Sequence, residues 1–284
     1  MSESGKRVLL AGCGDIGFQL GLLLQCEGFD VMALKRTSVT EWPFPVVTAD
    51  LQDPNSLRKL SGEYDYIVYT ATPDKHDPEG YEAAYVNGLR NLLHRAMPQK
   101  RLLLVSSSGV YGQSCGEWID ESSVTEPARF SGKILLQSEQ LAYSLCDSVT
   151  VVRFSGIYGP GRLRNIRRVQ EGQEIIEQPP QFTNRIHRDD CVAVLKFLIE
   201  MDVSGKELEP LYLASDDASV PEHEVMDYIA DTLDLPRLPR KAASVALGRN
   251  KRCNNHKLKD FGFQFRYPTY REGYQQIMEH AGLL

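Results

Sequence analysis

A glycine-rich turn lies between the first apolar strand-like run of this chain, Arg7 to Ala11, and its first helical pattern, Ile16 to Gln25. The turn consists of Gly12, Cys13, Gly14, Asp15, Ile16 and Gly17. A tight turn, a close approach of backbone to a pyrophosphate and close packing of a helix on a strand each require a residue without a side chain. The amino end of the helix adds N–H donors for an anion. This arrangement predicts a dinucleotide site that includes Asp15 and Ile16, and the alternative is a glycine turn with a structural role only.

The rest of the amino-terminal half alternates apolar runs with helical patterns, which is typical of a parallel sheet covered on both faces. We expect further strands at Val31–Leu34, Val46–Thr48, Tyr66–Ala71, Arg101–Ser106 and Val149–Phe154, and helices at Tyr81–Ala96 and Ser131–Leu145. The continuous apolar character of the run that follows Arg101 indicates burial on both faces. The sequence therefore predicts an α/β fold of the Rossmann type, with a doubly wound parallel sheet.

After Gly161 the alternation weakens, and we expect a small carboxy-terminal cap on the side of the sheet where ligands bind. In this part we expect a helix capped by Asp189 and Asp190, a strand at Leu211–Leu213, a helix at Glu222–Leu233 and a last helix after Pro268. The predicted division assigns residues 1–160 and 186–216 to a cofactor-binding core. It assigns residues 161–185 and 217–284 to the cap.

Composition excludes several classes of partner. With 284 residues, of which 42% are hydrophobic, the chain can bury a large core. A net charge of −6 argues against a nucleic-acid partner, and the lack of any run of about 18 apolar residues argues against a membrane partner. The amino terminus does not resemble a secretory signal, and the six cysteines lack paired spacing. We therefore expect a cytoplasmic protein without a metal site, acting on a small-molecule substrate.

The end of the second expected strand bears on the choice of cofactor. An NAD site commonly places a carboxylate there, which hydrogen-bonds the ribose 2′-hydroxyl. This chain instead has Lys35 and Arg36, two cations suited to a 2′-phosphate. The sequence predicts NADP, with NAD as the alternative, unless the two cations are simply a solvated pair.

A second group of motifs carries a family resemblance. The fifth expected strand runs into Val105 to Gly112, which reads VSSSGVYG, and Tyr85 to Gly88 reads YVNG. Arg153 to Arg162 reads RFSGIYGPGR, and Asn184 to His187 reads NRIH. In this order the chain resembles the extended short-chain dehydrogenase/reductase family, the NAD-dependent epimerase/dehydratase group, over nearly its whole length. The resemblance also implies a homodimer formed by paired helices.

The resemblance implies roles for individual residues. It places the catalytic serine at Ser107, whose hydroxyl would polarise a carbonyl or carbinol, and the asparagine that organises the site at Asn87. The cofactor positions it implies are Asp50, Leu51, Ala71, Thr72 and Ser106. Structural alternatives are open at this point, because Ser107 could cap a turn, Asn87 could bond the backbone and Asp50 could start a turn.

The chain departs from the family where the catalytic tyrosine and lysine belong. The register of the segment from Trp118 to Pro127 puts Phe130 and Ile134 on these two positions. Lys133, three residues after Phe130, lies on a neighbouring part of the helical face and could reach the ribose, but it cannot replace the proton donor. General acid–base catalysis contributes about 10²–10⁴ in rate, so the enzyme needs a substitute or performs other chemistry.

Two tyrosines are candidate substitutes, Tyr111 and Tyr158, because both belong to segments expected at the carboxyl side of the sheet. The alternative is that both rings simply pack. On the substrate side we expect Tyr158, Arg162 and Arg185, and the arginine cluster that begins at Arg162 could grip a phosphorylated group or be a solvated face.

Together these features predict an NADP-binding atypical oxidoreductase or epimerase/dehydratase-like enzyme that acts on a carbonyl or nucleotide-sugar-like substrate. Because Phe130 replaces the tyrosine, a non-catalytic NADP-binding sensor or scaffold protein is the main alternative. An NAD-dependent nucleotide-sugar epimerase is a third, and it is disfavoured because that reaction needs the tyrosine.

Overall fold

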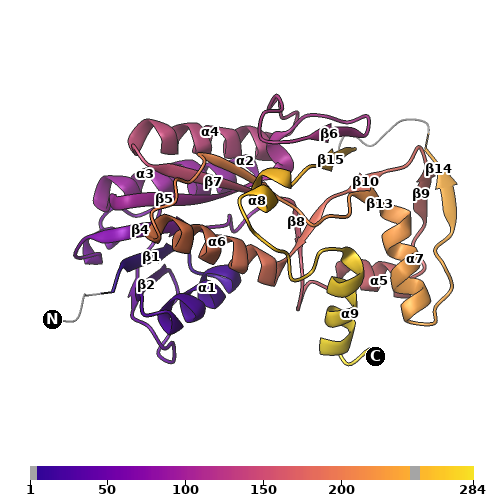
Figure 1. The fold of residues 1–284 in the computed structure, drawn as a ribbon, viewed down its shortest axis with the longest axis horizontal. Helices are drawn as coiled ribbons and strands as arrows, with labels where there is room; N and C mark the ends of the chain where they lie inside the picture. The colour runs from indigo at the N-terminus through magenta and orange to yellow at the C-terminus, as the bar shows by residue number, and fades with distance from the viewer. Residues whose placement is uncertain (1–4, 244–249) are drawn as a thin grey trace. The chain divides into compact units, whose positions relative to one another are not determined.

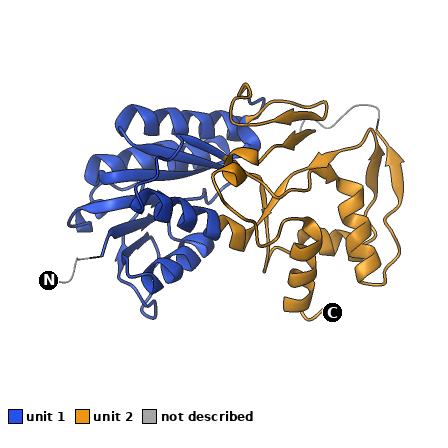
Figure 2. Cartoon of the chain, viewed as in Figure 1, with its two compact units in different colours: residues 1–110, 127–153, 192–212 blue, residues 111–126, 154–191, 213–284 orange. Residues whose placement is uncertain are grey.

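The structure of the chain is a computed structural model that describes residues 5–243 and 250–284. Residues 1–4, on which part of the argument against a secretory signal depends, lie outside this range. No helix in the described ranges is both long enough and apolar enough to cross a membrane. The chain forms two compact units, coloured separately in Figure 2. Unit 1 comprises residues 1–110, 127–153 and 192–212, and unit 2 comprises residues 111–126, 154–191 and 213–284.

A seven-stranded sheet forms the centre of unit 1. Its order is β12-β7-β5-β4-β1-β2-β3, and the pairings from β3 to β5 are parallel. The strands are β1 (Arg7–Ala11), β2 (Asp30–Lys35), β3 (Val46–Thr48), β4 (Tyr64–Tyr69), β5 (Pro98–Ser107), β7 (Val149–Phe154) and β12 (Leu211–Ala214). This confirms the predicted Rossmann-type fold, and the strand order reverses between β1 and β4. Ligands of open α/β sheets bind beside such a reversal.

Helices cover both faces of this sheet (Figure 1). One face carries α1 (Asp15–Cys26) and α6 (Arg188–Val203). The other face carries α2 (Pro78–Tyr81), the π-helical turn η2 (Glu82–Asn87), α3 (Gly88–Arg95) and α4 (Phe130–Leu145). Short 3₁₀ turns, η1 (Ser56–Lys59) and η3 (Ser108–Val110), complete unit 1.

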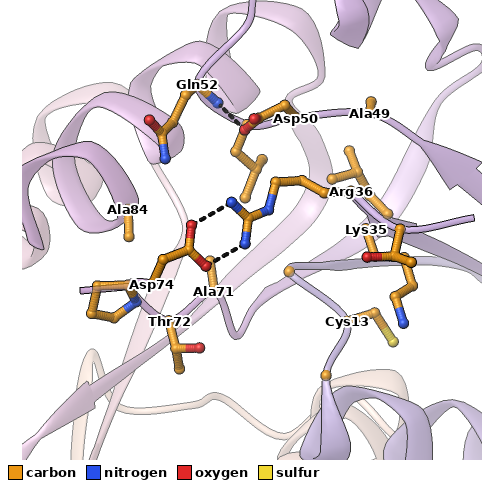
Figure 3. Close-up of a pocket in the computed structure, with 16 residues that line it drawn as sticks. Cys13, Lys35, Arg36, Ala49, Asp50, Gln52, Ala71, Thr72, Asp74 and Ala84 are labelled. Atoms are coloured by element: carbon orange, nitrogen blue, oxygen red, sulfur yellow. Dashed lines mark hydrogen bonds and ion pairs between the residues drawn. The ribbon is translucent and has the colours of Figure 1, made fainter. Parts of the chain in front are cut away.

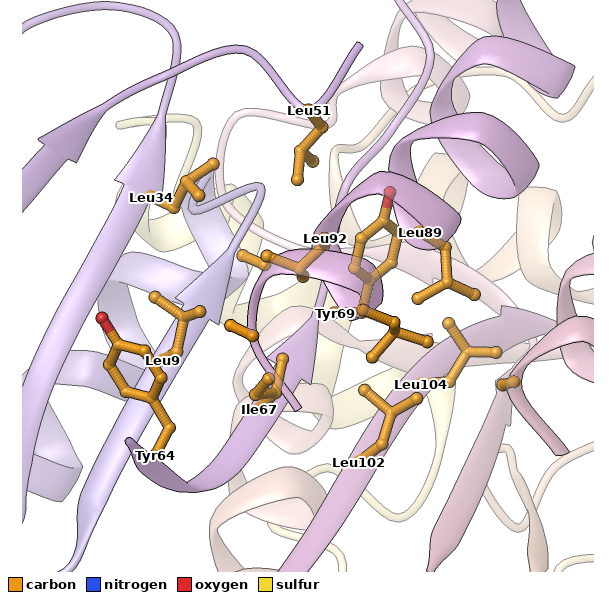
Figure 4. Packing of buried hydrophobic residues seen from close by; sticks show 14 of the residues in the cluster. Leu9, Leu34, Leu51, Tyr64, Ile67, Tyr69, Leu89, Leu92, Leu102 and Leu104 are labelled. Atoms are coloured by element: carbon orange, nitrogen blue, oxygen red, sulfur yellow. The ribbon is translucent and has the colours of Figure 1, made fainter. Parts of the chain in front are cut away.

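A hydrophobic core of unit 1 lies between the sheet and α3 and α4, and Figure 4 shows Leu89 and Leu92 of α3 in it. Leu102 and Leu104 of β5 contribute to it, whereas Leu103 points to the opposite face, and all three are at most 1% exposed. Burial on both faces explains the continuous apolar run in the sequence. The core thus fixes the strands whose carboxyl ends carry the pocket.

Unit 2 consists of short strand pairs and helices. Its pairs are β6 (Glu117–Ile119) with β15 (Lys251–Cys253), β8 (Gly156–Tyr158) with β11 (Arg185–His187), β9 (Ile175–Gln178) with β14 (Arg240–Ala242), and β10 (Phe182–Thr183) with β13 (Val220–Pro221). Its helices are α5 (Arg164–Gln170), α7 (Glu222–Thr232), α8 (His256–Asp260) and α9 (Tyr270–His280). Met226, Ile229 and Ile277 belong to its apolar core. These strands have two to four residues each, too short to give a periodic pattern in the sequence.

The expected helix cap by Asp190 is wrong. The Asp190 carboxylate is fully buried and accepts hydrogen bonds from the backbone N–H groups of Arg266, at 2.8 Å, and Tyr267, at 3.0 Å. A buried carboxylate requires such donors, and a distant loop supplies them here. Asp190 therefore ties the start of α6 to the segment before α9, both within unit 2.

Candidate functional site

A cavity of about 220 Å³ opens at the carboxyl ends of β1, β2 and β4, where the strand order reverses (Figure 3). Residues that the sequence assigns to a cofactor line it: Gly12, Gly14, Lys35, Arg36, Asp50, Leu51, Ala71 and Thr72. Cys13 of the glycine turn also lines it, together with residues that the sequence did not single out: Leu34, Thr37, Ala49, Gln52, Pro73, Asp74 and Ala84. Among the described residues, no group of His, Cys, Asp and Glu is arranged to hold a metal ion.

The glycine turn has the shape that a close-approaching ligand needs. Gly12 has φ +75°, and a Cβ on it would lie 2.4 Å from the Cα of Ala71. Gly14 is exposed, and a Cβ there would meet nothing nearer than 4.0 Å. Gly17 lets α1 pack closely, because its Cβ would lie 3.0 Å from the Cys13 sulfur. The turn and the amino end of α1, where Asp15 and Ile16 lie, fit a pyrophosphate.

The two cations at the end of β2 have different surroundings. The Lys35 ammonium lies 4.5 Å from the centroid of the Trp42 ring. The Arg36 guanidinium forms a two-pronged ion pair with the Asp74 carboxylate, which raises the pKa of Arg36 and lowers that of Asp74 (Figure 3). Both side chains of this pair are about half exposed, at 50% and 55%. The pair is therefore screened by salt, and a competing anion can displace it.

Asp50 also borders Arg36 in the pocket, as Figure 3 shows. Its Oδ1 accepts a hydrogen bond from the Gln52 backbone N–H at 2.9 Å, so the turn considered for it in the sequence is present. The carboxylates of Asp50 and Asp74 balance the formal charges of Lys35 and Arg36. The adenosine end of the pocket is therefore close to neutral before a ligand binds.

Ser106 lies beneath the site rather than on its surface. It is 5% exposed, and its hydroxyl donates a hydrogen bond of 2.5 Å to Oε1 of Glu139 on α4. Arg153 of β7 donates to both oxygens of the same carboxylate, at 3.0 and 2.6 Å. This buried group connects β5, α4 and β7, so the structure accounts for the Ser106 hydroxyl without a ligand.

Ser107 is half-buried at the end of β5, where its Oγ accepts a hydrogen bond of 3.1 Å from the Gly109 backbone N–H. The amino end of α4 packs directly on this turn, since a Cβ on Gly132 would lie 2.4 Å from the Gly109 carbonyl oxygen. Ser107 thus forms the turn that the structural alternative described. The turn that holds its Oγ packs against the amino end of α4.

The first residue of α4 is Phe130, whose ring is half-buried. Its ring centroid lies 5.5 Å from that of His76 and 5.4 Å from that of Tyr81. Ile134 is buried, with 9% exposed, whereas Lys133 is exposed to solvent. The helix therefore buries Ile134 and presents Lys133 to solvent, and the register that puts Phe130 and Ile134 on the family's tyrosine and lysine positions stays a prediction.

The side chain of Asn87 forms its hydrogen bond within its own helical segment. It ends the π-helical turn, is exposed, and its Oδ1 accepts a hydrogen bond of 3.3 Å from Arg90 Nη1. An exposed amide that bonds a residue three positions later has the geometry of an ordinary helix-surface pair. The organising role of Asn87 stays a prediction.

The expected substrate-side residues lie in unit 2, two of them in its interior. Tyr158 donates to the Thr269 carbonyl at 3.3 Å, and burial raises its pKa far above the usual range. Arg185 donates to two backbone carbonyls and lies 3.7 Å from the Asp216 carboxylate, a group whose pKa burial raises to about 7. Arg162 is half-buried before α5.

Tyr111, also in unit 2, is 2% exposed, and its carbonyl accepts a hydrogen bond of 3.0 Å from Lys251. Tyr111 and Tyr158 therefore have the packed surroundings of the structural alternative. Their catalytic roles stay predictions.

Asp74 was missed because it lies three residues beyond the expected strand end, in a loop without a pattern. A signal was available, since residues that follow a parallel strand meet at the same sheet edge as those that follow its neighbours. His76 and Tyr81 were missed because no sequence pattern signals their contacts with Phe130, which follows them by about 50 residues in the chain.

The chain matches a family model described as the NAD dependent epimerase/dehydratase family over residues 8–211. It is 34% identical to a protein from Methylobacillus flagellatus whose structure is described as that of an NAD-dependent epimerase/dehydratase. The TM-score of this pair is 0.84, and the match covers 99% of this chain and 100% of that chain. None of the proteins with curated descriptions matches the sequence.

Two more distant structures are similar in fold. MoeE5, solved in complex with UDP-glucuronic acid and NAD, is 22% identical with a TM-score of 0.77, and the match covers 97% of this chain and 99% of that chain. A UDP-glucose 4-epimerase from Thermus thermophilus, solved with NAD, is 19% identical with a TM-score of 0.76, and the match covers 96% and 98% of the two chains. At these identities the similarity concerns the fold.

Proposed function

The chain belongs to the NAD-dependent epimerase/dehydratase family, and on that premise we propose that it is an NADP-dependent oxidoreductase or epimerase/dehydratase-like enzyme. Its substrate would be a small carbonyl compound or a nucleotide-sugar-like molecule. The observation that carries the proposal is the pocket at the strand-order reversal, which is lined by the glycine turn and by Lys35 and Arg36. NAD is the alternative cofactor.

In this proposal the nicotinamide cofactor supplies or accepts a hydride, and the chain positions it. Gly12 and Gly14 admit the pyrophosphate, and Leu51 and Ala71 border the adenosine. Lys35 and Arg36 bind the 2′-phosphate, for which the Arg36 guanidinium offers paired donors. Ser107 orients the carbonyl or carbinol oxygen near the nicotinamide.

Asp74 competes with the 2′-phosphate for Arg36. We expect Asp74→Asn to tighten NADPH binding about three- to tenfold at low salt, because one repulsive charge is removed and Arg36 is released. NADH binding should change little, since it lacks the phosphate. Fluorescence titration of both cofactors at two salt concentrations measures the effect.

Arg36→Gln is the matched control, and it should reduce the preference for NADPH. Equal affinities of the unaltered protein for NADPH and NADH at low salt would contradict the NADP assignment and favour NAD. An Asp74→Asn variant that tightens both cofactors equally would show that Asp74 acts on the adenosine rather than on the phosphate.

The role of Ser107 is tested separately from binding. We expect Ser107→Ala to reduce turnover of a carbonyl substrate by about 10²-fold or more while NADPH affinity stays nearly constant, because the hydroxyl acts on the reacting oxygen. Ser108→Ala, in the next position, is the control. Full activity of Ser107→Ala would leave the residue with only its turn-forming hydrogen bond.

A non-catalytic NADP sensor or scaffold is the second candidate, and one observation favours it. Apolar side chains, Phe130 and Ile134, stand where the sequence register predicts the family's proton donor and its lysine. A protein of this kind binds NADPH but leaves its absorbance unchanged with every carbonyl compound and nucleotide-sugar supplied. Consumption of NADPH by any of them excludes a purely non-catalytic role.

A further inference from the structure

The ring of Phe130 packs against a hydrogen-bonded pair of side chains that can move a proton. Tyr81 ends α2, and His76 lies in the loop before it. The Tyr81 hydroxyl oxygen and His76 Nδ1 are 3.0 Å apart, and the two rings meet edge to face at 5.1 Å between centroids. A phenol held by an imidazole therefore adjoins the ring that lacks a hydroxyl.

We propose that Tyr81 is the proton donor of this site and that His76 reprotonates it, so that the pair replaces the phenol absent from Phe130. This inference rests on the proposed oxidoreductase function. It assigns the task of the family's tyrosine to a residue on a different helix.

The pair is linked along the chain to residues of the pocket, and its ring contacts with Phe130 link it to the helix that packs on the Ser107 turn. On one side, Asp74 and Ala84 line the pocket, His76 follows Asp74 by two residues, and Tyr81 precedes Ala84 by three, about one helical turn. On the other side, Phe130 begins the helix that packs on the turn of Ser107. All of these residues belong to unit 1.

The accessibility of Tyr81 separates it from the other candidate tyrosines. The Tyr158 hydroxyl is committed to a backbone carbonyl in the core of unit 2, and Tyr111 is 2% exposed. Tyr81 is only half-buried, and His76 is exposed. Burial raises the pKa of Tyr81, which keeps the phenol protonated at neutral pH and able to donate.

The proton path balances as follows for a reduction. The carbonyl carbon accepts a hydride from the cofactor while Tyr81 donates its O–H proton to the carbonyl oxygen. His76 returns a proton from Nδ1 to the Tyr81 oxygen, and its Nε2 takes up a proton from the bulk solvent. One carbonyl, one hydride and one proton become one alcohol, and the cofactor leaves oxidised.

The first test needs no substrate. In protein labelled with [¹³Cζ]tyrosine, the Tyr81 resonance is identified from its loss in Tyr81→Phe, and its pKa is measured with saturating NADP⁺ and with NADPH. Only NADP⁺ carries a positive nicotinamide ring, so a phenol facing it should titrate about one pKa unit lower than with NADPH. In the cofactor-free protein, His76→Asn should shift the same resonance. Tyr85, whose ring lies 5.4 Å from that of Tyr81, is the internal control and should respond less.

Failure of both cofactors to bind would overturn the proposed function, and this inference with it. Binding of both with an identical Tyr81 pKa would overturn the inference alone, as would a larger shift at Tyr85.

The second test measures turnover of NADPH with a panel of aromatic aldehydes, diketones and nucleotide-sugars. Tyr81→Phe should lower kcat about 10²-fold or more without changing NADPH affinity, and Phe130→Tyr added to it should restore part of the loss. His76→Asn should lower kcat less and change the pH–rate profile. Tyr85→Phe should retain activity. Full activity of Tyr81→Phe would refute the proposed role of Tyr81. If no compound of the panel is turned over, the Tyr81 pKa measured with the two cofactors decides the proposal.

Discussion

Replacing Glu139 with alanine is expected to lower the free energy of unfolding by about 3–5 kcal/mol, because it leaves a buried guanidinium without its carboxylate. Arg153 and Glu139 are paired through two hydrogen bonds, with side chains only 7% and 3% exposed. The change also removes the acceptor of the Ser106 hydroxyl. Urea unfolding followed by circular dichroism measures the loss.

Asp231→Ala is the matched control for this prediction. Arg237 binds Asp231 through two hydrogen bonds of similar length, 2.9 and 2.7 Å, but these side chains are 60% and 52% exposed. Water replaces the lost partner there, so we expect almost no change in stability. If Glu139→Ala were as stable as Asp231→Ala, burial of the Arg153–Glu139 pair would not explain any contribution of the pair to stability.

The sequence predicted the parts of the fold that depend on local pattern. The glycine turn, the strands of the parallel sheet and the apolar character of β5 all follow from neighbours in the chain. The role of Asp190 could not be predicted from local pattern. Its partners, the N–H groups of Arg266 and Tyr267, lie more than 70 residues away in the chain. A residue that can cap a helix can equally well bind a loop, and only the fold decides between them.

The candidate site was predictable to a similar extent. Lys35 and Arg36 could be recognised at the end of a strand, but the ion pair of Arg36 with Asp74 joins the ends of two different strands. The absence of a phenol at Phe130 was visible in the sequence. The phenol that packs against it was not, because Tyr81 reaches Phe130 from another helix and its partner His76 from a loop.

Substitutions of the two glycines of the pocket turn are expected to affect different properties, stability for Gly12 and cofactor binding for Gly14. Gly12→Ala should lower the free energy of unfolding by about 2–5 kcal/mol, through the positive φ of +75° and a methyl group that would lie 2.4 Å from the Ala71 Cα. Gly14→Ala should leave stability unchanged, because the nearest atom to its methyl group would be the Gly12 carbonyl oxygen at 4.0 Å, an ordinary van der Waals contact. Urea unfolding without cofactor measures both.

Although Gly14→Ala should not change stability, it should weaken NADPH binding. A methyl group on its exposed side would hold the pyrophosphate away from the N–H donors of α1, and losing one charge-assisted hydrogen bond, about 1.5–3 kcal/mol, weakens NADPH at least about tenfold. Fluorescence titration of the folded Gly14→Ala variant measures this loss. Unchanged affinity would place the pyrophosphate away from the turn, whereas a stable variant that no longer binds NADPH would show that Gly14 faces the cofactor and Gly12 shapes the backbone that presents it.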